Sequence, residues 1–340
     1  MISTGPTDYT FLVQINPQQP DIASFCQPGF FFNEYAHLRQ QNNGPFYLIS
    51  AVNRFTQEAE ARCAFFLNAS DALSPIAAPF GSIELSETLP TSVLNAFVSV
   101  LLETAHKLGC NRIRLVNYPR CYAPQQTDRL LSVLAEHEFV VVESNVSSFL
   151  PVNNKPLENN LIPAARRRLR KCREAGFVFA HRQAPNVPEV VRFIQNTRQQ
   201  LGYPLTLEPD QLINLLQEFP KQFSVFTVTN GPSLAAVVIT VRVRYDILYT
   251  FLPASDPACH NFSPMIFLID GLCSYCQQQE VQLLDLGVSL DARRQPKPGL
   301  LRFKRNLGAQ ESPKYTLERS IDRDDFTELQ DGPLKTLFIR

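Results

Sequence analysis

The chain has 340 residues, with 32 basic and 32 acidic side chains, a length that fits about two domains. Hydrophobic residues make up 44% and charged residues 19%, which excludes a disordered chain, a collagen-like rod and a coiled coil. The high counts of Phe (25) and Pro (26) predict a globular protein that is packed by phenylalanine and rich in fixed loops.

The charge is unevenly divided along the chain. Residues 1–150 hold 8 basic and 13 acidic side chains, whereas residues 151–340 hold 24 and 19. This asymmetry favours an anionic partner for the second half. The N-terminus lacks the charged and apolar regions of a signal peptide, and the apolar stretches are far shorter than the ~20 residues needed to span a bilayer. The sequence therefore predicts a cytoplasmic protein without a membrane span.

The first half predicts a unit of strands and helices after a lead-in segment, residues 1–30, that shows little periodicity. Strands are predicted at Phe46–Val52, Arg62–Leu67, Phe80–Leu85, Arg112–Val116 and Phe139–Leu150. One helix runs from Thr91, a candidate cap, to Gly109, and a second covers Thr127–His137. We assign this first repeat to residues 31–152.

The second half, residues 153–318, begins with helices and then returns to strands. Helices are predicted at Leu161–Ala175, Val187–Leu201, Asp210–Phe219 and Pro264–Gln279, and strands at Phe223–Thr229, Leu234–Val243, Ile247–Leu252 and Val281–Leu286. Residues 247–286 and residues 80–116 share the predicted order of strand, loop, helix and strand, which predicts a tandem structural duplication. The tail, residues 319–340, has acids at Asp322–Asp325 and ends in Leu-Phe-Ile-Arg, which suggests an extra strand or a partner contact.

A basic run of six cations in eight residues lies on the first predicted helix of the second half. It consists of Arg166, Arg167, Arg168, Arg170, Lys171 and Arg173. No acid stands at i±4 within the run, and like charges at that spacing repel by a few tenths of a kcal/mol per pair. Two interpretations stay open: a solvated helix face, and a surface for a phosphate-rich ligand.

A second basic group contains Arg302 and Lys304, on a short helix predicted at 299–308. Lys304 falls at the edge of the apolar face of this helix, which favours a partly buried ammonium with a fixed partner. Such a group can neutralise a phosphate or a developing negative charge. The alternative is a surface lysine whose amine reaches solvent.

Ser263 and Pro264 mark the start of the last long helix, with Ser263 as candidate N-cap and Pro264 at the first helical position. The free N–H groups of a helix start favour an anion. This start follows one strand and precedes another, and open sheets place ligands at strand ends. His260 and Asn261 lie immediately before it and join Ser263 as candidate ligand-binding residues.

Two polar residues stand in otherwise apolar strands. Asp285 shares its face with Val281 and Leu283, so its carboxylate points inward and needs a partner or a function. Tyr249 can present its hydroxyl as a proton donor. For each residue the alternative is a buried group that the backbone or an arginine satisfies.

The eight cysteines form no disulfide framework, which is typical of reduced thiols in a reducing compartment. Cys273 and Cys276 stand in an apolar helical run without a second pair, so core packing is favoured over a zinc or redox site. The sequence shows no metal-ligand cluster, no Ser/His/Asp spacing and no phosphate-binding glycine loop. We therefore predict no metal cofactor.

Taken together, these features resemble the GNAT superfamily of acyltransferases, in its tandem branch that includes the Fem-type aminoacyltransferases of peptidoglycan synthesis. The resemblance covers about residues 30–315. It rests on the segments Arg166–Phe177, Leu248–Phe251, Ser263-Pro264, Leu284–Gly287 and Leu300–Gly308, of which the closing Phe-Lys-x-x-Leu-Gly is the most specific. The resemblance implies an α/β (α+β) fold of two tandem GNAT-like repeats, each a mixed, mostly antiparallel sheet flanked by helices.

The resemblance also implies transfer of an acyl or aminoacyl group to an amine acceptor, such as a cell-wall precursor, in a cleft of the second repeat and between the repeats. The donor is an acyl-CoA or an aminoacyl-tRNA. Its phosphates are expected at Lys304, Arg302 and the helix start at Ser263. Lys304 matches the family's lysine near the phosphate or acyl group, and Tyr249 or Asp285 relays the proton.

The chain departs from the acetyl-CoA-using members at the junction between loop and helix. Those members carry Arg/Gln-x-x-Gly-x-Gly/Ala, whereas this chain has no glycine between Ala258 and Pro264. A loop without glycine holds its backbone further from a pyrophosphate, and Fem-type relatives also lack the signature. Two alternatives stay open: a small-molecule N-acetyltransferase that uses acetyl-CoA, and a non-catalytic GNAT-like binding module.

Overall fold

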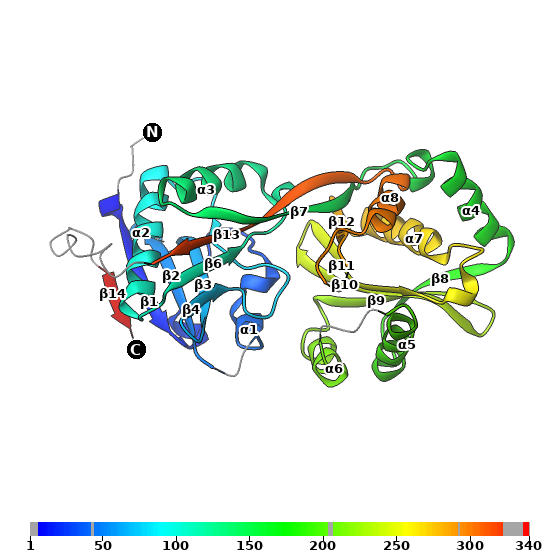
Figure 1. The fold of residues 1–340 in the computed structure, drawn as a ribbon, viewed down its shortest axis with the longest axis horizontal. Coiled ribbons are helices and arrows are strands. Elements are labelled where there is room, and N and C mark those ends of the chain that lie inside the picture. Colours follow the sequence, from blue (N-terminus) through cyan, green and yellow to red (C-terminus); the bar gives the residue numbers. More distant parts are fainter. Residues whose placement is uncertain (1–5, 42–43, 203–206, 292, 322–335, 340) are drawn as a thin grey trace. The chain divides into compact units, whose positions relative to one another are not determined.

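The computed structural model describes residues 6–41, 44–202, 207–291, 293–321 and 336–339. The chain divides into two compact units, here called the N-terminal unit (residues 1–145 and 313–340) and the C-terminal unit (residues 146–312) (Figure 1). This division differs from the predicted repeats 31–152 and 153–318, because residues 313–318 return to the first unit and residues 1–30 belong to it.

The N-terminal unit contains a sheet with the strand order β14-β1-β2-β3-β4-β6-β13, and β5 pairs with β3 at its side. The strands are β1 (Tyr9–Ile15), β2 (Phe46–Asn53), β3 (Ala59–Asn68), β4 (Asp71–Ser74), β5 (Glu84–Leu85), β6 (Arg112–Val116), β13 (Gln310–Ser320) and β14 (Thr336–Ile339). The helices are α1 (Tyr35–Leu38), α2 (Thr91–Lys107) and α3 (Pro124–Glu136).

Several features of this unit differ from the sequence-based expectations. The predicted lead-in contains β1, which pairs with β2 from Tyr9 to Ile15. The predicted strand 80–85 is reduced to the two residues of β5, and Pro90, not Thr91, occupies the N-cap of α2. The extra strand expected at the end of the chain is confirmed as β14, parallel to β1, whereas the acids 322–325 lie outside the described residues.

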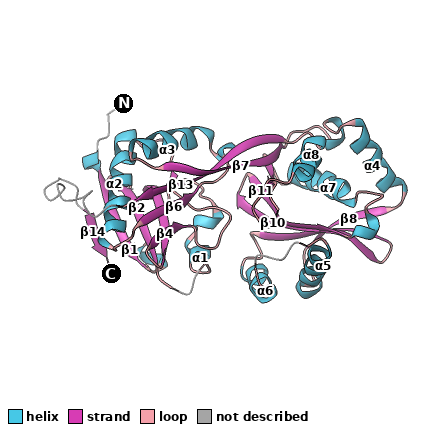
Figure 2. Ribbon diagram, viewed as in Figure 1, coloured by secondary structure: helices cyan, strands magenta, loops and turns pink. Residues whose placement is uncertain are grey.

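The C-terminal unit contains a sheet with the strand order β7-β12-β11-β10-β9-β8. The strands are β7 (Val140–Pro151), β8 (Phe177–Arg182), β9 (Phe223–Asn230), β10 (Ser233–Arg244), β11 (Ile247–Ser255) and β12 (Leu283–Val288). The helices are α4 (Pro163–Glu174), α5 (Val187–Gln200), α6 (Pro209–Glu218), α7 (Pro264–Gln278) and α8 (Pro298–Asn306). Within this unit, α5 and α6 lie on one side of the sheet and α7 on the other (Figures 1 and 2).

Both units contain a strand, a helix and a second strand parallel to the first. In the N-terminal unit β4 and β6 flank α2, and in the C-terminal unit β11 and β12 flank α7. The predicted duplication is therefore present, although its first strand is β4 and not the segment 80–85. In the part of the chain that the structure describes, no helix combines the length and apolar character needed to cross a membrane.

Helix α7 packs its apolar face on the sheet of the C-terminal unit. Cys273 and Cys276 lie in this core, as the C-x-x-C spacing within an apolar run predicts. Gly271 allows the helix to approach β8, because a Cβ added there would lie 2.3 Å from the ring of Phe179. The close approach fixes the distance between α7 and the edge strand.

We expect Gly271→Ala to lower the free energy of unfolding by about 1–3 kcal/mol, because the added methyl group overlaps the Phe179 ring and forces it to shift. Gly299→Ala is the matched control. It lies in α8 with no atom within 4 Å of the added Cβ, so it should be neutral or stabilise by about 0.5–1 kcal/mol. Urea denaturation of both variants measures the difference, and equal effects would contradict the packing argument.

Candidate functional site

The parallel strands β11 and β12 pair over only three positions. The last pair is Tyr249↔Asp285, although β11 continues to Ser255 and β12 to Val288. Open sheets bind ligands where neighbouring parallel strands stop pairing near their carboxyl ends. The end of this short ladder is therefore the candidate site, and it lies where the sequence analysis expects it.

A β-bulge interrupts β12 between Asp285 and Val288. Asp285 pairs with Phe149 and Val288 with Ser147, so β12 holds one extra residue against β7. Gly287 takes a positive φ of 72° in this bulge, a conformation that costs glycine little. Bulges next to functional sites re-aim side chains and end strand pairing, and this one stands at the end of the β11–β12 ladder.

The Asp285 carboxylate fixes this bulge from one side. Its Oδ1 accepts hydrogen bonds from Ser147 Oγ (2.9 Å) and from the Gly287 N–H (2.7 Å), and the residue is 2% exposed. The predicted inward orientation is confirmed. The sequence analysis did not propose Ser147 or Gly287 as site residues, because in the sequence a single glycine is the only sign of such a bulge.

Lys304 fixes the bulge from the other side. Its Nζ donates to the carbonyl oxygens of Gly287 (2.7 Å) and Val288 (2.9 Å), and the residue is 4% exposed. This confirms a buried ammonium with fixed partners. Burial lowers the pKa of Lys304 to about 8, while the charge of Asp285 acts in the opposite direction. An ammonium has three N–H donors, so one stays available beyond the two carbonyls.

Tyr249 completes the group around the bulge. A Cβ on Gly287 would lie 3.1 Å from the Tyr249 ring, so the phenol covers the glycine closely. Burial and then the negative charge of Asp285 raise the pKa of the Tyr249 hydroxyl. The phenol therefore stays protonated near neutral pH and acts as a donor. The structure brings Tyr249, Asp285 and Lys304 together.

The loop before α7 holds the predicted ligand-binding residues His260, Asn261 and Ser263. The backbone N–H groups of Cys259, His260, Phe262 and Ser263 all donate to carbonyl oxygens of residues 256–260. Ser263 occupies the N-cap with a positive φ of 58° and makes no side-chain cap, which corrects the predicted capping role; its Oγ donates to the His260 carbonyl oxygen. These four N–H groups are therefore already engaged by carbonyl oxygens of the loop itself.

The basic run on α4 is partly neutralised. Arg173 pairs with Glu158 (2.8 Å) and Asp270 (3.0 Å), and Arg170 lies 3.6 Å from Glu174, an acid just beyond the run. Lys171 reaches the loop before α7, where its Nζ donates to the Asn261 carbonyl (3.2 Å) and lies over the Phe262 ring.

The remaining cations of the run keep an exposed position. Arg166, Arg167 and Arg168 are exposed, although Arg166 donates to the carbonyl oxygens of Glu158 and Leu161. Arg302 is also exposed, whereas Lys304 two residues later is buried. No described contact joins Arg302 to the bulge, so its predicted role beside Lys304 stays a prediction. Among the described residues no cluster of His, Cys, Asp or Glu could hold a metal ion.

In the N-terminal unit the corresponding position beside β4 and β6 is filled. The chain after β4 returns to the end of β6, where the Gly81 N–H donates to the Val116 carbonyl oxygen (3.0 Å). The Phe80 ring then packs edge-on against Phe30 (5.6 Å between centroids) and Tyr122 (5.8 Å). Among the described residues, aromatic rings thus occupy the position that corresponds to the bulge of β12.

The depressed pKa of Lys304 has a consequence for stability. Its value is about 8 in the folded chain against an ordinary 10.5, so between these pH values the unfolded chain binds more protons and the free energy of unfolding rises with pH. Relative to Lys304→Met, the native chain should gain up to about 3 kcal/mol from pH 7.5 to 10.5. Urea denaturation across this range measures the gain; parallel curves for the two proteins would contradict it.

Comparison with known proteins gives the family of the C-terminal unit. Residues 162–305 match the family model described as an acetyltransferase (GNAT) domain. Residues 162–305 are thus similar to a GNAT domain, and the fold of the chain is similar to that of a tandem GNAT protein. The match spans the helices, the β11–β12 pair and Lys304. No curated protein matches the chain by sequence.

Solved structures agree with this fold. FemX is similar with a TM-score of 0.66 at 12% identity, over 86% of this chain and 92% of FemX. The C-terminal domain of an Agrobacterium fabrum protein assigned as a lysylphosphatidylglycerol synthetase gives 0.53 at 13%, over 76% and 81%. A tandem GNAT protein from the clavulanic acid biosynthesis pathway gives 0.50 at 10%, over 82% and 84%. The expected fold of two tandem GNAT-like repeats is confirmed.

Proposed function

We propose that this tandem GNAT protein transfers an aminoacyl group from an aminoacyl-tRNA to an amine acceptor, with the reaction at the bulge of β12. The observation that carries the proposal is the end of the β11–β12 ladder at Tyr249 and Asp285, directly beside the buried ammonium of Lys304. A protonated phenol and a buried cation at one strand end are suited to a reaction in which a carbonyl oxygen gains negative charge.

The proposed step forms one amide bond. The nitrogen of the neutral amine attacks the carbonyl carbon of the donor ester, the new C–N bond forms and the C–O bond to the carrier breaks. Tyr249 gives its proton to the leaving oxygen and regains one from the attacking nitrogen, so the proton count balances. Lys304 stabilises the negative charge of the carbonyl oxygen or of a donor phosphate, and Asp285 positions the bulge.

The choice of donor rests on the loop before α7. Because four of its N–H groups donate within the loop, the pyrophosphate cradle of coenzyme A does not fit, and we derive no step through that group. Similarity to FemX and to a lysylphosphatidylglycerol synthetase domain supports an aminoacyl donor and an acceptor from the cell wall or a lipid. Such a donor would place the reaction in the cytoplasm.

A second candidate is transfer from acetyl-CoA, which the description of the matched family favours. Thermal-shift measurements with aminoacyl-tRNA, acetyl-CoA and a long-chain acyl-CoA separate the two. A ligand at 100 times its dissociation constant adds ~2.7 kcal/mol of stability, and we expect this shift with aminoacyl-tRNA alone. A shift with acetyl-CoA alone would overturn the proposed donor, and binding without any amide formation would identify a non-catalytic binding module.

A further inference from the structure

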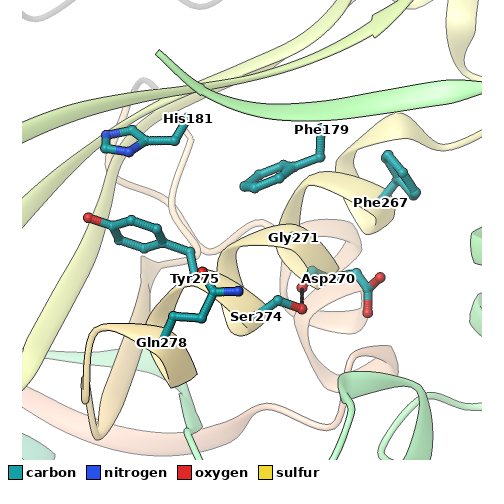
Figure 3. Close-up of a pocket in the computed structure, with 8 residues that line it drawn as sticks. All are labelled: Phe179, His181, Phe267, Asp270, Gly271, Ser274, Tyr275 and Gln278. Atoms are coloured by element: carbon teal, nitrogen blue, oxygen red, sulfur yellow. Dashed lines mark hydrogen bonds between the residues drawn. The ribbon is translucent and has the colours of Figure 1, made fainter. Parts of the chain in front are cut away.

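A cavity of about 380 Å³ opens between α7 and β8, outside the site at the bulge (Figure 3). Four ring-bearing side chains line it, Phe179 and His181 from β8 and Phe267 and Tyr275 from α7, and all four are partly exposed. Partly exposed rings around one hollow are unusual on a soluble surface and mark a binding site. The proposed transfer reaction makes no use of them.

The rings are held in place by the core behind them. The buried ring of Phe226 stacks on Phe179 (5.7 Å between centroids) and on His181 (4.6 Å), and Tyr275 packs edge-on against His181 (5.1 Å). Gly271 lets the Phe179 ring lie directly against the backbone of α7. The cavity is therefore formed before any ligand arrives, which lowers the entropy cost of binding a flat group.

Polar side chains occupy the α7 wall of the same cavity. Asp270, Ser274 and Gln278 line it at successive turns of the helix (Figure 3). The Asp270 carboxylate and the Gln278 amide can accept hydrogen bonds from an amino group in the plane of an aromatic ring, which is how carboxylates and amides recognise cytosine and adenine. A flat heterocycle with an exocyclic amine fits both the rings and these acceptors.

Cations stand on two sides of the cavity. A neighbouring cavity of about 450 Å³ shares His181 and Tyr275 with it and is also lined by Arg182 and Lys221. The Arg182 guanidinium is oriented by a hydrogen bond from its Nε to Thr227 Oγ1 (3.0 Å). On the other side, Arg173 of the basic helix α4 pairs with Asp270. Arg173 is already paired with Glu158 and Asp270, so Arg182 and Lys221 of the neighbouring cavity are the candidates for binding a phosphate.

We propose that this aromatic cavity binds a nucleotide of the acyl donor, with the base between the rings and the phosphate at Arg182 and Lys221. The source of the nucleotide rests on the proposed function, since a single-stranded RNA end and coenzyme A both carry a base and a phosphate. Stacked bases beside cationic side chains are the general mode of single-strand RNA binding. The exposed arginines of α4 favour RNA as the source.

Isothermal titration calorimetry of the full chain tests the cavity with four probes: AMP, adenosine, coenzyme A and a single-stranded ACCA ribonucleotide. We expect Tyr275→Ala and Phe267→Ala each to weaken binding of AMP and of the RNA about tenfold or more. Tyr245→Ala, which removes a tyrosine that is 64% exposed in the same unit, is the matched control and should bind as the native chain does. Arg182→Ala should weaken AMP and leave adenosine unchanged.

The outcomes separate the cavity from the transfer reaction. AMP binding is measured without an acceptor and without any transfer, so a failed transfer reaction leaves this result intact. The proposed nucleotide site is wrong if Tyr275→Ala and Phe267→Ala, both shown to be folded by their melting temperatures, bind AMP and RNA as the native chain does. It is also wrong if the native chain binds neither AMP nor RNA. Binding of coenzyme A without binding of RNA would support the cavity and overturn RNA as the source.

Discussion

Lys304→Ala is expected to lower the rate of aminoacyl transfer by about 10²–10³-fold, the usual loss when one donor to a developing oxyanion is removed. Lys304 is the buried cation at the end of the β11–β12 ladder, and two of its N–H groups already hold the Gly287 and Val288 carbonyls. In the proposed reaction the third N–H group donates to the reacting group. Single-turnover kinetics with aminoacyl-tRNA and the identified acceptor measure the loss.

The variant also removes the partners of two carbonyl groups, which costs about 1–3 kcal/mol for each buried group left without a hydrogen bond. Circular dichroism must therefore show that Lys304→Ala is folded at the assay temperature. Lys155→Ala, an exposed lysine of the same unit, is the control and should keep the native rate. Native turnover by a folded Lys304→Ala variant would remove this lysine from the mechanism.

Glu84→Ala in the N-terminal unit should lower the free energy of unfolding by about 3–5 kcal/mol. Glu84 pairs with Arg62 at 2.9 Å, and their side chains are 4% and 11% exposed. It also accepts hydrogen bonds from the Phe30 N–H (2.7 Å) and from Asn33 Nδ2 (3.2 Å). Removing the carboxylate leaves a buried guanidinium without its main partner.

Glu34→Ala is the matched control for this prediction. Glu34 is the second partner of Arg62, at 2.8 Å, but its side chain is 48% exposed. Exposed ion pairs contribute about 0–1 kcal/mol, so this variant should unfold close to the native midpoint. Chemical denaturation of both variants at pH 7 provides the comparison, and similar losses for the two glutamates would contradict the assigned difference in burial.

Much of the C-terminal unit could be predicted because its signals are local. The helices α4 to α8 follow from hydrophobic spacing, and the β9–β10 hairpin turns at Gly231 and Pro232, between the two predicted strands. Lys304 and Asp285 could be selected because a charged residue on an apolar face needs a partner. Both have partners, and both lie at the same bulge.

The remaining features depend on contacts between segments far apart in the sequence. The bulge at Gly287 exists through Ser147, 138 positions from Asp285 in the chain, and no local pattern reports it. The β1 strand, Tyr-Thr-Phe-Leu-Val-Gln-Ile, carries a local strand signal that the sequence analysis missed, whereas its pairing with β2 cannot be read from that signal. The internal hydrogen bonds of the loop before α7 could not be foreseen from a missing glycine alone.

The backbone leaves the N-terminal unit after residue 145 and returns to it at residue 313, which has a consequence for folding during synthesis. The N-terminal unit needs β13, which pairs with β6 from Thr316↔Val116 to Ser320↔Arg112, yet that strand is translated only after the whole of residues 146–312. Until then the N-terminal unit lacks the strand that pairs with this edge of β6, whereas all strands of the C-terminal unit have already been translated. We expect the C-terminal unit to reach a protease-resistant state on the ribosome first, and chaperones to engage the incomplete N-terminal unit.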